Sequence, residues 1–139
     1  MRVLITGSRT WDDEETIRAA LDAVAGSAAA AGFDRLTVVH GACPQGADAI
    51  ADAWVRAHPA ATAERHPANW QKHGRGAGMV RNRAMVKRGA DLVLAFIRDD
   101  SPGATQCADA AVEAGLILRV WRYGEPGVWA SDSREATGG

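Results

Sequence analysis

The chain has few of the features that mark secreted, membrane-bound or metal-dependent proteins. It has two cysteines among 139 residues, Cys43 and Cys107, and they lie too far apart to form a metal-binding spacing. No apolar run approaches the length needed to cross a membrane, and the apolar start at residues 1–5 is too short for a secretory signal. We therefore expect a cytoplasmic protein with reduced cysteines, no bound metal and no membrane partner.

An excess of charge of one sign is also missing. The 16 basic and 17 acidic side chains nearly cancel, which argues against a nucleic-acid partner, because duplex binding needs a broad basic surface. The distribution is uneven, since residues 65–90 contain no Asp or Glu and seven Lys or Arg. Such a segment is typical either of an anion site or of a solvated helix face. We interpret Arg75 and Arg81, which flank a Gly-rich turn, as functional, and Lys87 and Arg88 as surface charge.

The best-known nucleotide and hydrolase motifs do not occur. There is no G-x-x-x-x-G-K-[ST] loop, no nucleophile elbow and no zinc-binding helix. The glycines at positions 74, 76 and 78 do not follow directly on a strand, so they do not match the dinucleotide fingerprint. We predict no cofactor, and the sequence identifies no catalytic residue.

What the sequence does contain is a regular alternation of strand and helix patterns. Strands are predicted over residues 2–6, 36–40, 61–65, 92–97 and 117–121, and helices over 13–31, from 47 onward, 79–88 and 104–114. Asp12, with Glu15 three residues later, predicts the cap of the first helix. Residues 66–78 are predicted to form a long loop.

This alternation predicts one α/β domain over residues 1–122, with a five-stranded parallel sheet and helices on both faces. The long apolar runs at 2–6 and 92–97 predict that these two strands lie side by side at the centre, and the weak run at 61–65 is expected at an edge. Residues 123–139 are rich in Gly, Pro and Ser, and we predict a poorly ordered tail there.

Turns rich in glycine and polar residues follow the predicted strands. They are Gly7-Ser8-Arg9, the segment from His40 to Asp48, the segment from Gly74 to Asn82, and Ser101 to Thr105. In an open parallel sheet, ligands bind outside the carboxyl ends of the strands. Glycine-rich turns at helix N-termini expose N–H groups there, which favours an anion such as phosphate. Four such turns in one small chain predict a phosphate site.

The order of these motifs resembles the YspA-type, YpsA-related branch of the SLOG superfamily. The motifs are Gly7-Ser8-Arg9, Gly46-Ala47-Asp48, Pro67-Ala68-Asn69-Trp70, His73-Gly74-Arg75, Arg81-Asn82 and Pro102-Gly103-Ala104-Thr105. The resemblance covers Met1 to Trp121. It implies a Rossmann-like three-layer sandwich that binds a nucleotide or nucleotide-derived small molecule as a sensor or carrier, and related folds commonly form homodimers. The superfamily includes the LOG phosphoribohydrolases and the Smf/DprA DNA-processing proteins.

The resemblance also implies a set of ligand-binding residues. Gly7, Ser8 and Arg9 would make the first phosphate or ribose contact, and Gly103, Ala104 and Thr105 the last phosphate cradle. Gly41, Gly46 and Asp48 would shape the second loop, where Asp48 either bonds a ribose hydroxyl or supports the helix start. Arg81 would pair with phosphate. The set is completed by Arg75, Asn82 and Trp70, the last of which either stacks on a base or covers the edge of the core.

One departure from the LOG pattern bears on catalysis. LOG enzymes carry Pro-Gly-Gly-x-Gly-Thr-x-x-Glu, and the positions of its last Gly and its Glu are occupied here by Ala104 and Ala108. Without that carboxylate the usual acid–base route is missing. We therefore predict a binding protein, with an N-glycosidase or phosphoribohydrolase that uses Asp48 or Asp109 as the alternative. A DNA-processing protein of the Smf/DprA type is the third possibility.

Overall fold

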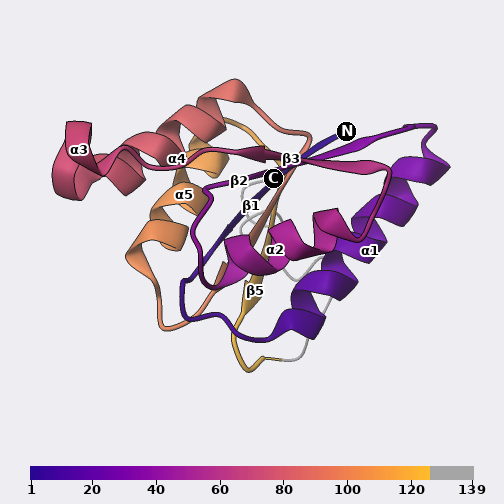
Figure 1. The fold of residues 1–139 in the computed structure, drawn as a ribbon, viewed down its shortest axis with the longest axis horizontal. Coiled ribbons are helices and arrows are strands. Elements are labelled where there is room, and N and C mark those ends of the chain that lie inside the picture. Colours follow the sequence, from indigo (N-terminus) through magenta and orange to yellow (C-terminus); the bar gives the residue numbers. More distant parts are fainter. Residues whose placement is uncertain (126–139) are drawn as a thin grey trace.

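The computed structural model describes residues 1–125 and has a single five-stranded sheet at its centre (Figure 1). The strands are β1 (Arg2–Gly7), β2 (Leu36–His40), β3 (Ala61–Arg65), β4 (Leu92–Ile97) and β5 (Leu118–Arg122). They are all parallel and lie in the order β3-β2-β1-β4-β5. The predicted α/β class, the central pairing of β1 with β4 and the edge position of β3 are confirmed.

Helices cover both faces of the sheet and complete a Rossmann-like three-layer sandwich. One core lies between the sheet and helices α1 (Glu14–Ala30) and α2 (Ala47–Arg56). The other lies between the sheet and helices α4 (Ala77–Arg88) and α5 (Pro102–Glu113). Alternate residues of β1 point to opposite cores, as in any strand buried on both faces. Among residues 1–125, no helix has the length and apolar character needed to cross a membrane.

The start of α1 differs from the prediction. The cap is Asp13, whose side chain accepts a hydrogen bond from the Thr16 N–H at 3.2 Å. Asp12 instead pairs with Arg98 and accepts a hydrogen bond from the Tyr123 hydroxyl. The predicted capping box of Asp12 and Glu15 is therefore wrong, because a second acid one residue later offers the same chemistry.

The predicted loop over residues 66–78 contains regular structure. The short helix α3 (Trp70–His73) is followed by a turn of 3-10 helix, η1 (Gly74–Gly76), and α4 begins at Ala77. Asn69 caps α3 by accepting a hydrogen bond from the Lys72 N–H at 3.0 Å. Figure 1 shows α3 at one extremity of the molecule, beyond α4.

Two further boundaries bear on the predicted segments. Helix α5 begins at Pro102, two residues earlier than predicted, because proline is favoured in the first turn. At the end of β5, Tyr123 is bonded through its N–H to the Ile97 carbonyl and packs on Trp11. The predicted tail of residues 123–139 therefore starts with a tethered residue, and its part from 126 onward lies outside the described residues.

A charged cluster on the sheet ties β1, β3 and α4 together. Arg2 donates two hydrogen bonds to the Glu64 carboxylate, at 2.8 and 3.0 Å. His66 lies 2.7 Å and Arg88 3.6 Å from the same carboxylate. The Arg2 hydrogen bonds, with help from His66, lower the pKa of Glu64 from 4.5 to about 2. Because the folded pKa lies below the ordinary value, the cluster stabilises the fold above about pH 5 and loses this effect as the pH falls toward 2.

We predict that Glu64→Gln lowers the free energy of unfolding by about 1–2 kcal/mol at pH 7, because it removes a bidentate, partly buried ion pair. The difference from the wild type should shrink as the pH is lowered from about 5 toward 2. Urea denaturation at several pH values measures both effects. The control is Glu113→Gln, since Glu113 is exposed on α5 and makes no ion pair within residues 1–125. A Glu64→Gln penalty that does not change with pH would contradict this account.

Candidate functional site

A cavity of about 520 Å³ opens at the carboxyl edge of the sheet. Each of the four predicted glycine-rich turns contributes to its lining, together with the α3 segment. Of the predicted ligand-binding residues, eleven lie on its wall: Gly7, Ser8, Arg9, Gly41, Asp48, Trp70, Arg75, Arg81, Asn82, Gly103 and Ala104. The structure therefore brings together, at one place, residues that are up to 97 positions apart in the sequence (7 to 104).

Ser8 connects three segments at this edge. Its N–H donates to the Phe96 carbonyl at 2.9 Å, and its own carbonyl accepts from the Ala47 N–H at 3.3 Å. Its hydroxyl accepts from the Arg98 N–H at 2.8 Å and lies 3.3 Å from the Arg98 carbonyl. The Ser8 hydroxyl is thus engaged within the protein, and its clearest role is to join the β1–α1 and β4–α5 turns.

Two glycines allow these turns to touch. A Cβ at Gly7 would lie 2.3 Å from the Cβ of Ala47 and 2.9 Å from the Phe96 carbonyl oxygen. Gly46 has a φ of +72°, and a Cβ there would lie 2.2 Å from the Ser8 carbonyl oxygen. Gly46 does not line the cavity itself. These positions therefore need glycine because the backbones approach closely.

Three helices begin at the cavity without a side-chain cap. The first turn of α2 contributes Asp48, that of α4 contributes Gly78 and Met79, and that of α5 contributes Gly103 and Ala104. The first N–H groups of a helix have no partner within the helix, and the helix dipole adds a partial positive charge at this end. The Ala47 N–H of α2 and the Ala77 N–H of α4 already donate to the Ser8 and Gly74 carbonyls. The start of α5 therefore offers its N–H groups to an anion, and the dipoles of α2 and α4 add positive potential. Thr105, in the same turn of α5, is not part of the wall.

The arginines of the wall fall into two groups. Arg9 and Arg75 make no hydrogen bond or ion pair within residues 1–125, and the Arg9 guanidinium lies 5.9 Å from the centre of the Trp70 ring. Arg81, in contrast, donates to the carbonyls of Gly41 and His66 and to the Asn82 side chain. Arg9 and Arg75 are thus free to pair with a ligand, while Arg81 braces the wall.

Eleven of the 22 wall residues lie outside the predicted ligand-binding set, and two of them, Arg98 and Cys43, make hydrogen bonds that shape the cavity. Arg98, the first residue after β4, donates to the Thr10 carbonyl at 2.8 Å and lies over the Tyr123 ring. Its position just past the carboxyl end of a central strand is the signal that could have identified it. Cys43 lies in the predicted β2–α2 loop, but its contribution is its backbone N–H, which no side-chain pattern reveals.

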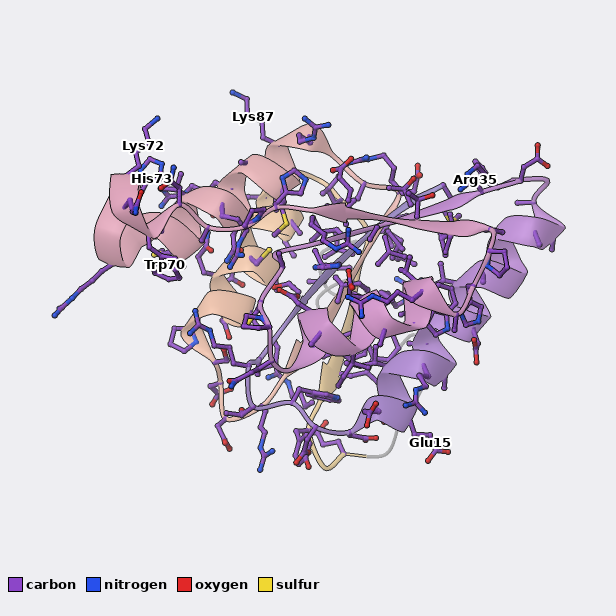
Figure 2. All side chains as sticks on the ribbon, in the orientation of Figure 1. Glu15, Arg35, Trp70, Lys72, His73 and Lys87 are labelled. Carbon is purple, nitrogen blue, oxygen red and sulfur yellow. The ribbon has the colours of Figure 1, made fainter. Side chains whose placement is uncertain are left out.

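Trp70 stands at the mouth of the cavity. It lies in α3 and is 50% exposed, so it does not cover the core. Figure 2 shows it on the side of α3 opposite Lys72 and His73. An exposed indole beside a cavity that attracts anions offers a flat surface on which an aromatic ring can stack.

Asp48 is the buried acid of the cavity. It is 7% exposed, and its carboxylate accepts a hydrogen bond from the Cys43 N–H at 3.2 Å. Burial raises its pKa, although His40, the Cys43 N–H and Arg81 oppose the shift. The other wall carboxylate, Asp99, is exposed. Asp48 therefore provides the wall with a desolvated carboxyl group that can accept or donate a proton.

The alternative carboxylate on α5 does not face the cavity. Asp109 is exposed and lies outside the wall, while Ala108 is fully buried between α5 and the sheet. Cys107 is equally buried, and burial raises its pKa to about 11, so it does not form a reactive thiolate. Within α5, neither Asp109 nor Cys107 therefore offers reactive chemistry at this site.

Comparisons with known proteins identify the family of the chain. The model of the YspA, cpYpsA-related SLOG family matches residues 1–73. The chain belongs to this family. It is also 43% identical over 119 residues to the Gene 61 protein of Mycobacterium phage D29, which covers 83% of this chain and 91% of the phage protein. Membership of the SLOG family indicates nucleotide-related binding or processing.

Among solved structures, the C-terminal domain of a hydrogenase from Pyrococcus furiosus is similar in overall layout. It is 18% identical, with a TM-score of 0.45, and the match covers 86% of this chain and 89% of that domain.

We predict that Gly7→Ala destabilises the protein by about 1–3 kcal/mol, because the new methyl group overlaps the Ala47 side chain. Gly26→Ala is the matched control, because Gly26 is exposed within α1 and no atom lies within 4 Å of a new Cβ. This change should raise the free energy of unfolding by about 0.5–1 kcal/mol, since alanine favours the helix over glycine. Thermal and urea denaturation measure both. A neutral Gly7→Ala would mean that the two turns do not touch.

Proposed function

We propose that the cavity binds a nucleotide-derived small molecule through at least one phosphate group, in a sensor or carrier role. The observation that carries this proposal is the meeting, on one cavity, of three helix starts that lack side-chain caps with two arginines, Arg9 and Arg75, that make no hydrogen bond or ion pair within residues 1–125. Backbone N–H groups and guanidinium groups are the donors that bind phosphate oxygens in proteins. Family membership supports a ligand related to nucleotides.

The size and shape of the cavity support the same ligand class. Its volume of about 520 Å³ lies within the range of about 300–1,000 Å³ usual for small-molecule sites. On the wall, Asp48 and Ala104 are buried at the starts of α2 and α5, whereas Trp70 is half exposed. A phosphate at the helix starts would therefore leave a base free to reach the Trp70 ring.

A second candidate function is hydrolysis of an N-glycosidic or phosphoribosyl bond. It is favoured by one observation, the buried Asp48 carboxyl group on the cavity wall with its raised pKa. A carboxyl group of this kind suits general acid–base catalysis. The LOG-type glutamate position is Ala108, which is buried in the core, so a hydrolase would have to use Asp48 instead.

The direct test of ligand class is to purify the protein and identify co-purifying small molecules by mass spectrometry. The mutational test compares AMP with ribose 5-phosphate by calorimetry. We expect Arg9→Ala to weaken both ligands about tenfold or more, because a charge-assisted hydrogen bond contributes about 1.5–3 kcal/mol. Trp70→Ala should weaken AMP by a similar factor, since base stacking contributes about 1–3 kcal/mol, and should leave ribose 5-phosphate unchanged.

Arg83→Ala is the matched control for these variants. Arg83 is an exposed arginine of α4 without a partner in residues 1–125, and it does not line the cavity. Equal affinities for the wild type, Arg9→Ala and Trp70→Ala would remove both residues from the binding site.

We further predict that the protein releases no significant free base from AMP or related nucleotides. General acid–base groups contribute about 10²–10⁴-fold, and the usual glutamate is missing. Chromatography of the reaction mixture measures the release. Robust turnover that disappears in Asp48→Asn would show that the protein is a hydrolase and not only a binding protein.

A further inference from the structure

His40 is a buried titratable residue that the proposed binding function does not use directly. It ends β2 and is 2% exposed, but it does not line the cavity. Its Nε2 lies 2.9 Å from Oδ1 of Asp52, and its Nδ1 accepts a hydrogen bond from the Ala42 N–H at 3.0 Å. Both ring nitrogens are therefore bonded within the protein.

These bonds fix where the ring carries its proton. Because the Ala42 N–H donates to Nδ1, that nitrogen must present a lone pair, and the ring proton lies on Nε2 facing Asp52. Asp52 is held in turn by Arg65 at 2.7 Å and Arg56 at 2.8 Å. The carboxylate keeps these two partners whether or not the imidazole is present, so it is not left alone if His40 is removed.

The residue that His40 holds has an unusual backbone conformation. Ala42 has a φ of +58°, in the left-handed region that residues with a side chain rarely adopt. The residues on either side of Ala42, Gly41 and Cys43, both line the cavity. The Gly41 carbonyl accepts from Arg81, and the Cys43 N–H donates to Asp48. The strained turn therefore sets the positions of two wall side chains.

We infer that His40 is a positioning residue: through the Ala42 N–H it holds the Gly41–Cys43 turn in its strained conformation, and so places Asp48 and Arg81 for the ligand. The effect on ligand affinity rests on the proposed function. The effect on the conformation of the turn is independent of the proposed function, and the two effects are measured in separate experiments.

The turn is tested first, in the wild-type protein without ligand. Nitrogen NMR should show the His40 ring protonated on Nε2 and accepting at Nδ1, and hydrogen exchange should show protected Ala42 and Cys43 amides. In His40→Ala both amides should lose protection. A ring protonated on Nδ1, or protection that survives in His40→Ala, would overturn the inference whatever the ligand.

The ligand effect is tested by calorimetry with AMP. His40→Ala should weaken AMP about tenfold, whereas His58→Ala should not, since His58 lies at the other end of α2, stacked on Trp54. The decisive variant is the double change His40→Ala with Ala42→Gly. Glycine adopts the left-handed conformation without strain, so the double variant should recover most of the lost affinity and the protection of the Cys43 amide, which donates to Asp48. The amide of residue 42 should stay unprotected, because its acceptor is absent.

The outcomes separate the two levels of the proposal. If the double variant does not recover the protection of the Cys43 amide, His40 contributes only core packing and the inference fails. If protection responds as expected but the wild type does not bind AMP or any of ADP, GMP and GDP, the proposed nucleotide function fails while the positioning of the turn stands. Circular dichroism and thermal denaturation verify that each variant is folded.

Discussion

The contact of the β1–α1 turn with the start of α2 governs the geometry of the cavity. Gly7 and Gly46 let the two backbones approach to a distance at which a side chain would collide, and Ser8 bonds the same region to the β4–α5 turn. Three of the four turns around the cavity are thereby fixed relative to one another. The first turns of α2 and α5 are thereby held on the wall of the same cavity, and a wall fixed in advance lowers the cost of binding an anion.

The wall combines a positive environment with one buried acid. Burial disfavours the charged form of Asp48, and the Cys43 N–H and Arg81 reduce that penalty without removing it. The Cys43 N–H that partly offsets the desolvation of Asp48 belongs to a turn that is itself strained at Ala42. Strain and desolvation at the same few residues are typical of sites under functional constraint. Elsewhere in the fold, ionisable residues such as Glu64 have partners that lower their pKa.

The sequence was sufficient for the sheet and for half of the wall, for a simple physical reason. Apolar runs at β1 and β4 need burial on both faces, and turns after parallel strands must meet at one edge. The sequence did not predict the hydrogen bonds between residues far apart in the chain. Nothing local distinguishes the cap Asp13 from Asp12, and nothing before folding shows that the Ser8 hydroxyl bonds to Arg98, 90 residues away. Asn69, the N-cap of α3, could have predicted this helix, but the nearby glycines favoured a loop.

The site divides into a braced interior and an open mouth. Ser8, Arg81 and Asn82 already use their polar groups within the protein, so their positions are set before a ligand arrives. Arg9 and Arg75 have no such partners in the part of the chain that the structure describes, and Trp70 is half exposed on a helix of four residues. Preorganised groups lower the entropic cost of binding, whereas free side chains must be ordered by the ligand itself. The interior is therefore suited to holding one chemical group in a fixed position, and the mouth to discriminating what is attached to it.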